Sequence, residues 1–142
     1  MMPIYLSEQF EEFQHGAFTA HLYRFSIEHH RFVVVFSPID TTDEDYLQFR
    51  SEEAGFRIPS RCYDLKFDRE ENFVNETYYE PPAPGEFSRR YGFALELADA
   101  LETIITLHHN VYRARAYLAV AENDKLQRYY DRHLTMMYYM KS

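Results

Sequence analysis

Apolar residues recur along this chain with two different periods, one typical of helices and one typical of strands. The longest helical pattern runs from Ser88 to about His109 and predicts a helix with one side turned toward a core. Its apolar stripe has steps of three and four residues and consists of Tyr91, Ala94, Ala98, Leu101, Ile105 and His108, widened by Leu97 and Ile104. Glu96, Asp99 and Glu102 fall on the opposite side, where water solvates them.

Strand patterns dominate the first half of the chain. Residues 31–37 contain the run Phe-Val-Val-Val-Phe, which is apolar on both faces and predicts a central strand covered from both sides. Residues 18–27 form a predicted strand just before it. A third strand is predicted where apolar and charged residues alternate. Its residues are Tyr63, Leu65 and Phe67 on the apolar side and Asp64, Lys66 and Asp68 on the polar side.

A short helix is predicted over residues 7–15. Ser7 has the position of an N-terminal cap, and Phe10 and Phe13 would share one face of the helix. Gly16 would end it, because glycine adopts the left-handed conformation of a helix C-terminus easily. This segment would be the first element of the fold.

A second helix is predicted from about Asp43 to Ala54. Thr42 and Asp45 have the spacing of a capping box, with aspartate in place of the usual glutamate. Acidic residues in the first turn favour the positive end of the helix dipole. Gly55 has the position of the residue that follows a helix C-terminus.

The second half of the chain begins with a weaker strand pattern over residues 73–79. The proline-rich segment 80–85 then interrupts regular structure, because proline fixes φ and donates no backbone hydrogen bond. After the long helix, residues 114–121 form a short predicted strand, and Asn123 opens a C-terminal helix. A last strand over residues 136–140 is left open.

These elements follow the order α-β-β-α-β-β-α-β-α, which is typical of an α+β protein with a single mixed or antiparallel sheet. The 142 residues are enough for one domain, spanning 1–142, that buries its own core. The six-residue proline-rich segment is too short to separate two domains. We therefore expect one α+β domain.

Charge and composition narrow the class of function. With 23 acidic and 15 basic residues, the net charge of −8 leaves the chain short of the basic surface that nucleic-acid binding requires. No apolar run approaches the length of a membrane span. Cys62 is the only cysteine, and the N-terminus has neither the basic nor the apolar region of a signal peptide. We expect a cytoplasmic protein that binds neither nucleic acid nor membranes.

Tyrosine is frequent, with 13 residues that include the adjacent pairs 78–79, 129–130 and 138–139. Exposed tyrosine offers a large contact area with few rotatable bonds, so it is favoured in protein interfaces. Packing at the edge of a core explains the pairs equally well. We expect a binding or regulatory protein with an acidic, Tyr-rich surface, acting as an inhibitor of a protein partner or as a homodimer. Its candidate interaction residues are Glu96, Asp99 and Glu102.

A second hypothesis rests on the segment Arg-Arg-Tyr-Gly-Phe-Ala at residues 89–94. From Arg89 it has the form R-x-x-G-x-A, and in this it resembles the acyl-CoA loop of the GNAT acetyltransferase superfamily. The resemblance covers residues 89–130, because the predicted helix is followed by a strand, by Asn123 and, seven residues later, by Tyr130.

The resemblance implies an acyl-CoA-dependent N-acyltransferase with acetyl-CoA as its cofactor. In that family the loop amides hold the pyrophosphate at a helix N-terminus. The residues that this assigns to cofactor binding are Arg89, Gly92, Phe93, Ala94 and Asn123. Tyr130 would be the general acid that protonates the departing thiolate. If the chain does not bind acyl-CoA, these residues have structural roles: Gly92 permits close helix packing, and Asn123 is an ordinary helix cap.

Two further patterns concern metal ions. The seven histidines include the adjacent pairs 29–30 and 108–109, but neighbours on a helix or strand point apart, so neither pair forms a bidentate site. A zinc site assembled from distant residues stays open, and no metal ligands are assigned. Asp40, Asp64 and Lys66 are similar to the PD-(D/E)xK nuclease arrangement, which holds Mg²⁺. The acidic net charge does not suit an enzyme that acts on DNA. The alternating pattern of Asp64 and Lys66 is explained instead by the solvent-exposed face of a strand.

Overall fold

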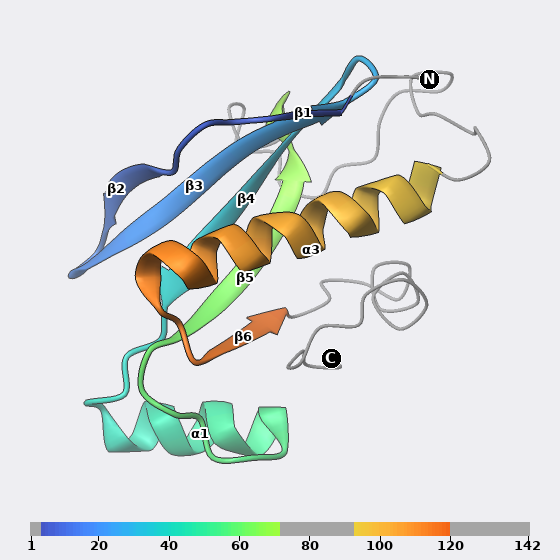
Figure 1. The fold of residues 1–142 in the computed structure, drawn as a ribbon. Coiled ribbons are helices and arrows are strands. Elements are labelled where there is room, and N and C mark those ends of the chain that lie inside the picture. Colours follow the sequence, from blue (N-terminus) through green and yellow to red (C-terminus); the bar gives the residue numbers. More distant parts are fainter. Residues whose placement is uncertain (1–3, 72–92, 120–142) are drawn as a thin grey trace.

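The fold is α+β, as predicted. A computed structural model describes residues 4–71 and 93–119, which form one mixed sheet and two helices (Figure 1). In chain order the elements are β1 (Ile4–Leu6), β2 (Glu11–His15), β3 (Phe18–Ile27), β4 (His30–Pro38), α1 (Glu44–Ala54), β5 (Cys62–Arg69), α3 (Phe93–Tyr112) and β6 (Ala116–Ala119). The strand order is β1-β3-β4-β5-β6, and β2 pairs with β3 as well.

The predicted central strand, residues 31–37, is confirmed. It forms most of β4, which pairs antiparallel with β3 on one side and with β5 on the other. Val34 lies opposite Tyr23 of β3 and Phe67 of β5. Phe32, Val33, Val34 and Phe36 are all buried. Because consecutive side chains of a strand point to opposite faces, this run of buried residues shows that both faces of β4 are covered.

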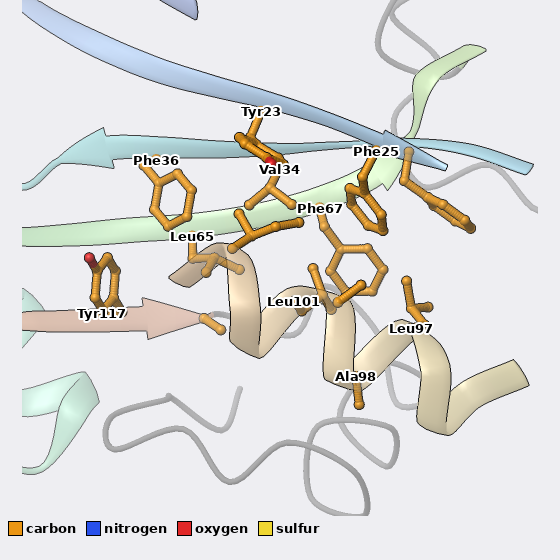
Figure 2. Packing of buried hydrophobic residues seen from close by; sticks show 14 of the residues in the cluster. Tyr23, Phe25, Val34, Phe36, Leu65, Phe67, Leu97, Ala98, Leu101 and Tyr117 are labelled. Atoms are coloured by element: carbon orange, nitrogen blue, oxygen red, sulfur yellow. The ribbon is translucent and has the colours of Figure 1, made fainter. Parts of the chain in front are cut away.

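The helix α3 lies across one face of the sheet (Figure 1). In the chain α3 lies between β5 and β6, which pair in parallel with Cys62 opposite Ala116. Parallel strands cannot be joined by a tight turn, so a crossover of this kind is required. Aromatic and aliphatic side chains of the strands fill the space between the sheet and Leu97 and Leu101 of α3 (Figure 2).

The predicted apolar stripe of the long helix is largely confirmed in the part that the structure describes. Leu97, Ala98, Leu101, Ile104 and His108 are buried, and Ile105 is half-buried. Ala100 is buried as well, so the stripe is wider than predicted. The predicted strand over residues 114–121 corresponds to β6.

The opposite face of the sheet packs against α1. Cys62, Ala116 and Leu118 alternate with core residues of the α3 face, and together with Leu47 of α1 they form a second apolar cluster. The predicted helix over residues 43–54 is confirmed, and Gly55 follows it in the left-handed conformation with φ of 82°.

The helix cap of α1 differs from the prediction. Asp43, and not Thr42, is the N-cap, and its carboxylate accepts a hydrogen bond of 3.1 Å from the Tyr46 amide. Thr42 instead donates its amide and its hydroxyl to the Asp40 carboxylate. With Asp43 as the cap, the third helical residue is Tyr46, whose side chain cannot complete a capping box.

The predicted helix over residues 7–15 is wrong. Its second half is β2, whose pairing with β3 runs from Glu11 opposite Leu22 to His15 opposite Phe18. Gly16, with φ of 64°, belongs to the two-residue loop of this hairpin instead of ending a helix. Two phenylalanines three residues apart were too few to distinguish a helix from an irregular strand.

Several predicted elements lie outside the described residues. They are the strand over residues 73–79, the helix beginning at Asn123 and the strand over residues 136–140. The first described element, the strand β1, precedes all predicted elements and was not predicted. No helix within residues 4–71 and 93–119 is long and apolar enough to cross a membrane.

Candidate functional site

The residues assigned to acyl-CoA binding are mostly beyond the described part of the chain. Arg89, Gly92, Asn123 and Tyr130 fall in the ranges 72–92 and 120–142. Phe93 and Ala94 are the first residues of α3, so their backbone is helical. The acyl-CoA hypothesis therefore stays a prediction.

The predicted interaction residues Glu96, Asp99 and Glu102 all lie on α3. Asp99 is exposed, whereas Glu96 and Glu102 are half-buried. The exposed residues beside Asp99 are uncharged, including Thr103, whose hydroxyl donates to the Asp99 carbonyl. This side of α3 thus carries three neighbouring carboxylates, of which that of Asp99 is the exposed one, and its role as an interaction surface stays a prediction.

A denser acidic surface is found on α1. Phe49 is 59% exposed, although phenylalanine is usually buried. Asp45, Glu52 and Glu53 are also exposed and lie four residues before, three after and four after Phe49. Residues at these spacings are neighbours on one side of a helix. We refer to Asp45, Phe49, Glu52 and Glu53 as the α1 outer face. Tyr46, 38% exposed, lies beside it.

The inner side of α1 is fixed to the sheet by an ion pair. Arg50 donates from Nη1 to Oδ2 of Asp64 on β5 at 2.8 Å, and Nη2 binds the other carboxylate oxygen. Nη1 also donates to the Tyr46 hydroxyl at 2.8 Å. Both side chains of the Arg50–Asp64 pair are largely buried. A two-point contact of this kind fixes orientation as well as distance.

The Arg50–Asp64 pair also determines the charge of the α1 outer face. Hydrogen bonding to Asp64 raises the pKa of Arg50, so the guanidinium stays charged but is turned inward. Arg50 is the only basic residue in α1. The carboxylates of Asp45 and Glu52 are consequently left facing solvent without a cation of their own helix beside them. Glu53 lies 3.3 Å from Arg50 Nε but is still mostly exposed.

A shallow hollow of about 360 Å³ lies beside the α1 outer face. Its walls come from α1 and from the segment that follows it, and they combine carboxylates with the ring of Phe56. The lining residues are Glu44, Gln48, Ser51, Glu52, Gly55, Phe56 and Arg57. Glu52 belongs to both features, so the hollow adjoins the α1 outer face, and its own lining carries both acidic side chains and the basic Arg57.

A second unusual group of side chains is buried at the C-terminal end of α3. His21 of β3 and His108 of α3 are bonded through Nδ1 and Nε2 at 2.8 Å. The other ring nitrogen of His108 is bonded to the Tyr117 hydroxyl of β6 at 2.7 Å. We refer to His21, His108 and Tyr117 as the histidine chain. It joins α3 and the next strand, β6, to His21 of β3, which lies 87 residues before His108.

Aromatic rings enclose the histidine chain. Phe36 stacks on His108 with 4.0 Å between ring centroids, and Tyr112 stacks on His21 at 3.6 Å. His108 is completely buried and His21 is 5% exposed. Burial lowers the pKa of His108 to about 3, with a further lowering from His21. Burial also lowers the pKa of His21, and Glu12 opposes this. Both imidazoles are therefore neutral at pH 7.

The nuclease-like carboxylates are engaged elsewhere. Asp64 is bound to Arg50, and Asp40 accepts two hydrogen bonds from Thr42, which lower the pKa of Asp40. Lys66 is exposed on the face of β5 that carries Asp64. Within residues 4–71 and 93–119, no three histidine, cysteine or acidic side chains are grouped as metal ligands. Burial raises the pKa of the Cys62 thiol to about 12, so it is protonated and unreactive at neutral pH.

Comparison of the chain with known protein families, curated proteins and solved structures found no match. The residues of both features must therefore be interpreted from geometry alone. Sequence reasoning missed the α1 outer face, although a phenylalanine flanked by acids at helical spacing was a visible signal. It placed His108 on the core stripe but had no signal for His21, which lies 87 residues away.

Proposed function

We propose that this chain is a binding protein that docks a positively charged protein partner onto the α1 outer face. The observation that supports the proposal is the exposed ring of Phe49 among Asp45, Glu52 and Glu53. The function is the binding or regulatory role expected from the sequence. Its main contact surface is now α1, and the α3 residues Glu96, Asp99 and Glu102 are a secondary surface.

The α1 outer face combines the two kinds of residue that protein interfaces use, an apolar contact residue and charged residues around it. A large aromatic ring that leaves water on binding supplies affinity, and hot spots are enriched in such residues. The surrounding carboxylates speed the approach of a basic partner and reject acidic ones. The ring of Phe49 can also receive an arginine or lysine of the partner over its face. Self-association through α1 is disfavoured, because it would bring like charges together.

The rigid attachment of α1 supports the same function. Leu47 and the Arg50–Asp64 pair hold the helix on the sheet, so Phe49 is presented without ordering a flexible segment. An already ordered surface loses less conformational entropy on binding. The hollow that Glu52 shares with the α1 outer face gives room for a side chain of the partner.

The proposal is tested by recovering partners from the native cell with three versions of the chain. Wild type and the Glu8→Lys variant, which changes an exposed acid outside α1, should retain the same basic protein. Phe49→Ala should lose it while keeping the wild-type melting temperature. A partner that is acidic, or that is retained by Phe49→Ala, would contradict the proposal.

The secondary surface is separated from the main one by charge reversal. Glu52→Lys should weaken binding more than Asp99→Lys, because only Glu52 adjoins the exposed ring. Both changes alter the net charge equally, so a difference between them reports position and not overall charge. If Asp99→Lys has the larger effect, the partner docks on α3 instead.

A second candidate function is acyl-CoA-dependent acyl transfer. One observation favours it: α3 is followed by the strand β6, and a helix followed by a strand is the order that the resemblance to the GNAT family implies. Acetyl-CoA at 100 times its dissociation constant should then stabilise the protein by about 2.7 kcal/mol. Gly92→Glu should abolish this stabilisation, because it adds a side chain and a like charge to the loop. An unchanged melting temperature with acetyl-CoA would exclude this function.

A further inference from the structure

The histidine chain has room for only a limited number of protons. Nitrogens 2.8 Å apart, such as Nδ1 of His21 and Nε2 of His108, can share one hydrogen but not two. The contact of 2.7 Å between His108 Nδ1 and the Tyr117 oxygen also contains one hydrogen. Each protonation state of the histidine chain must therefore fit one hydrogen into each of these two contacts.

The neutral chain satisfies every contact. In one arrangement Tyr117 donates to Nδ1 of His108, and Nε2–H of His108 donates to His21. In the reverse arrangement Nδ1–H of His21 donates to Nε2 of His108, and Nδ1–H of His108 donates to the Tyr117 oxygen. Either direction leaves both imidazoles uncharged, as their burial requires.

One added proton is accommodated without breaking a contact. If His21 carries a hydrogen on both nitrogens, its Nδ1–H donates to His108, and His108 donates onward to Tyr117. The positive charge then sits on the histidine that retains some exposure and lies opposite Glu12 on β2. Glu12 raises the pKa of His21, which favours this position for the first proton.

A second added proton has no place. With both imidazoles protonated, Nδ1 of His21 and Nε2 of His108 would each carry a hydrogen into the same 2.8 Å contact. Two positive rings would also lie side by side in a buried site. The described titratable groups that face them are Glu12 on β2, Tyr63 on β5, Tyr112 and His109 on α3, and Tyr117 on β6. Of these only Glu12 is an acidic side chain, and it is exposed.

We propose that the histidine chain is a proton-controlled attachment of the C-terminal end of α3 to the sheet. The attachment stays intact when the pair His21 and His108 binds one proton, and it separates when the pair binds a second. Acidification would therefore release the end of α3 while the antiparallel strands β3, β4 and β5 stay paired. This behaviour is independent of the partner docking assigned to α1, which lies on the other face of the sheet.

The wild-type protein provides the first test. Nitrogen chemical shifts of the imidazoles, followed during acid titration, report protonation and tautomer for each ring. We expect one proton to be bound first, with the His108 hydrogen on Nδ1. The second should be bound at lower pH, together with a rise of at least about tenfold in amide exchange over residues 105–112, since opening is linked to pH. Two bound protons with these amides still protected would overturn the proposal.

Matched variants provide the second test. His21→Gln keeps a polar side chain that can pair with Nε2 of His108 but cannot be protonated. Its α3 amides should therefore lose the acid-induced exchange step. His29→Gln changes an exposed histidine in the turn between β3 and β4 and should keep the wild-type response. If His21→Gln shows the same exchange step as wild type, the attachment is not released by the histidine pair. The wild-type titration decides the matter even if His21→Gln does not fold.

Discussion

The C-terminal end of α3 and the α1 outer face each contain residues in the environment that their chemistry least favours. At the first, two histidines are almost completely buried; at the second, a phenylalanine is mostly in water. The buried histidines are tolerated because each ring nitrogen at their contacts has a partner. Phe49 has no such compensation within the described structure, and the proposed partner would cover it. Changes in the histidine chain should alter stability, whereas changes at Phe49 should alter binding.

The largest loss of stability is expected at a buried position that has no polar partners. It gives a reference value for the smaller effects at the histidine chain and at Phe49. Val34→Asp would bury a carboxylate at the centre of β4, between β3 and β5. We expect it to cost more than about 4 kcal/mol, a large part of the roughly 5–15 kcal/mol by which a typical domain is stable. Chemical denaturation measures the loss, with Arg31→Gln as an exposed control on the same strand. A stable Val34→Asp protein would show that β4 is not central.

The next effect concerns the ion pair that supports the α1 outer face. Asp64→Ala should cost about 3 kcal/mol, because it leaves the buried Arg50 guanidinium without its carboxylate. Glu53→Ala removes the exposed partner of the same arginine and should cost less than about 1 kcal/mol. Both free energies of unfolding come from denaturant titration. Equal losses would mean that Asp64 does not hold α1 in place.

A smaller effect should follow from pH. The pKa of His108 is lowered from its ordinary 6.5 to about 3, so the unfolded chain binds a proton there more readily than the folded chain does. The stability due to this histidine is fully present above pH 6.5 and declines as pH falls toward 3. The decline should approach about 1.4 kcal/mol per pH unit, which amounts to about 2 kcal/mol between pH 6.5 and 5. His108→Gln should remove this part of the slope in denaturation curves measured between pH 7 and 5.

The smallest effect on stability is expected at the α1 outer face. Phe49→Ala should change the free energy of unfolding by no more than about 0.5 kcal/mol, because the ring buries little surface within the chain. Thermal unfolding of the two proteins side by side measures the difference. A loss of about 3 kcal/mol would show that Phe49 packs within the fold, and the contrast with the histidine chain would disappear.

The most predictable parts of the fold were those with long, one-sided patterns. The stripe from Ala98 to His108 and the apolar run of β4 specified both the type of element and the buried face. The hairpin of β2 and β3 was not predicted in full, because Phe10 and Phe13 fit a helix turn as well as a strand. Periodicity reports which side of an element is buried but not which other element covers it.

The candidate sites show the same limit more sharply. His108 was correctly placed on the core side of its helix, but its partner His21 is set by the way β3 and α3 pack. Phe49 was detectable in principle, since Leu47 and Arg50 define the inner side of α1 and leave Phe49 outside. It was missed because the buried position 50 holds an arginine, so the inner side of the helix does not show an apolar pattern in the sequence. The burial of Arg50 depends on Asp64, which comes later in the sequence and on another strand.

The parallel pairing of β5 with β6 has a consequence for the time course of folding. The hairpins β2–β3 and β3–β4 join residues close together in the chain, so they can form early. Cys62 and Ala116 meet only after the intervening chain, including α3, has been brought back to the sheet. Closing so long a loop is slow. The edge of β5 that pairs with β6 must therefore wait during synthesis until β6 arrives.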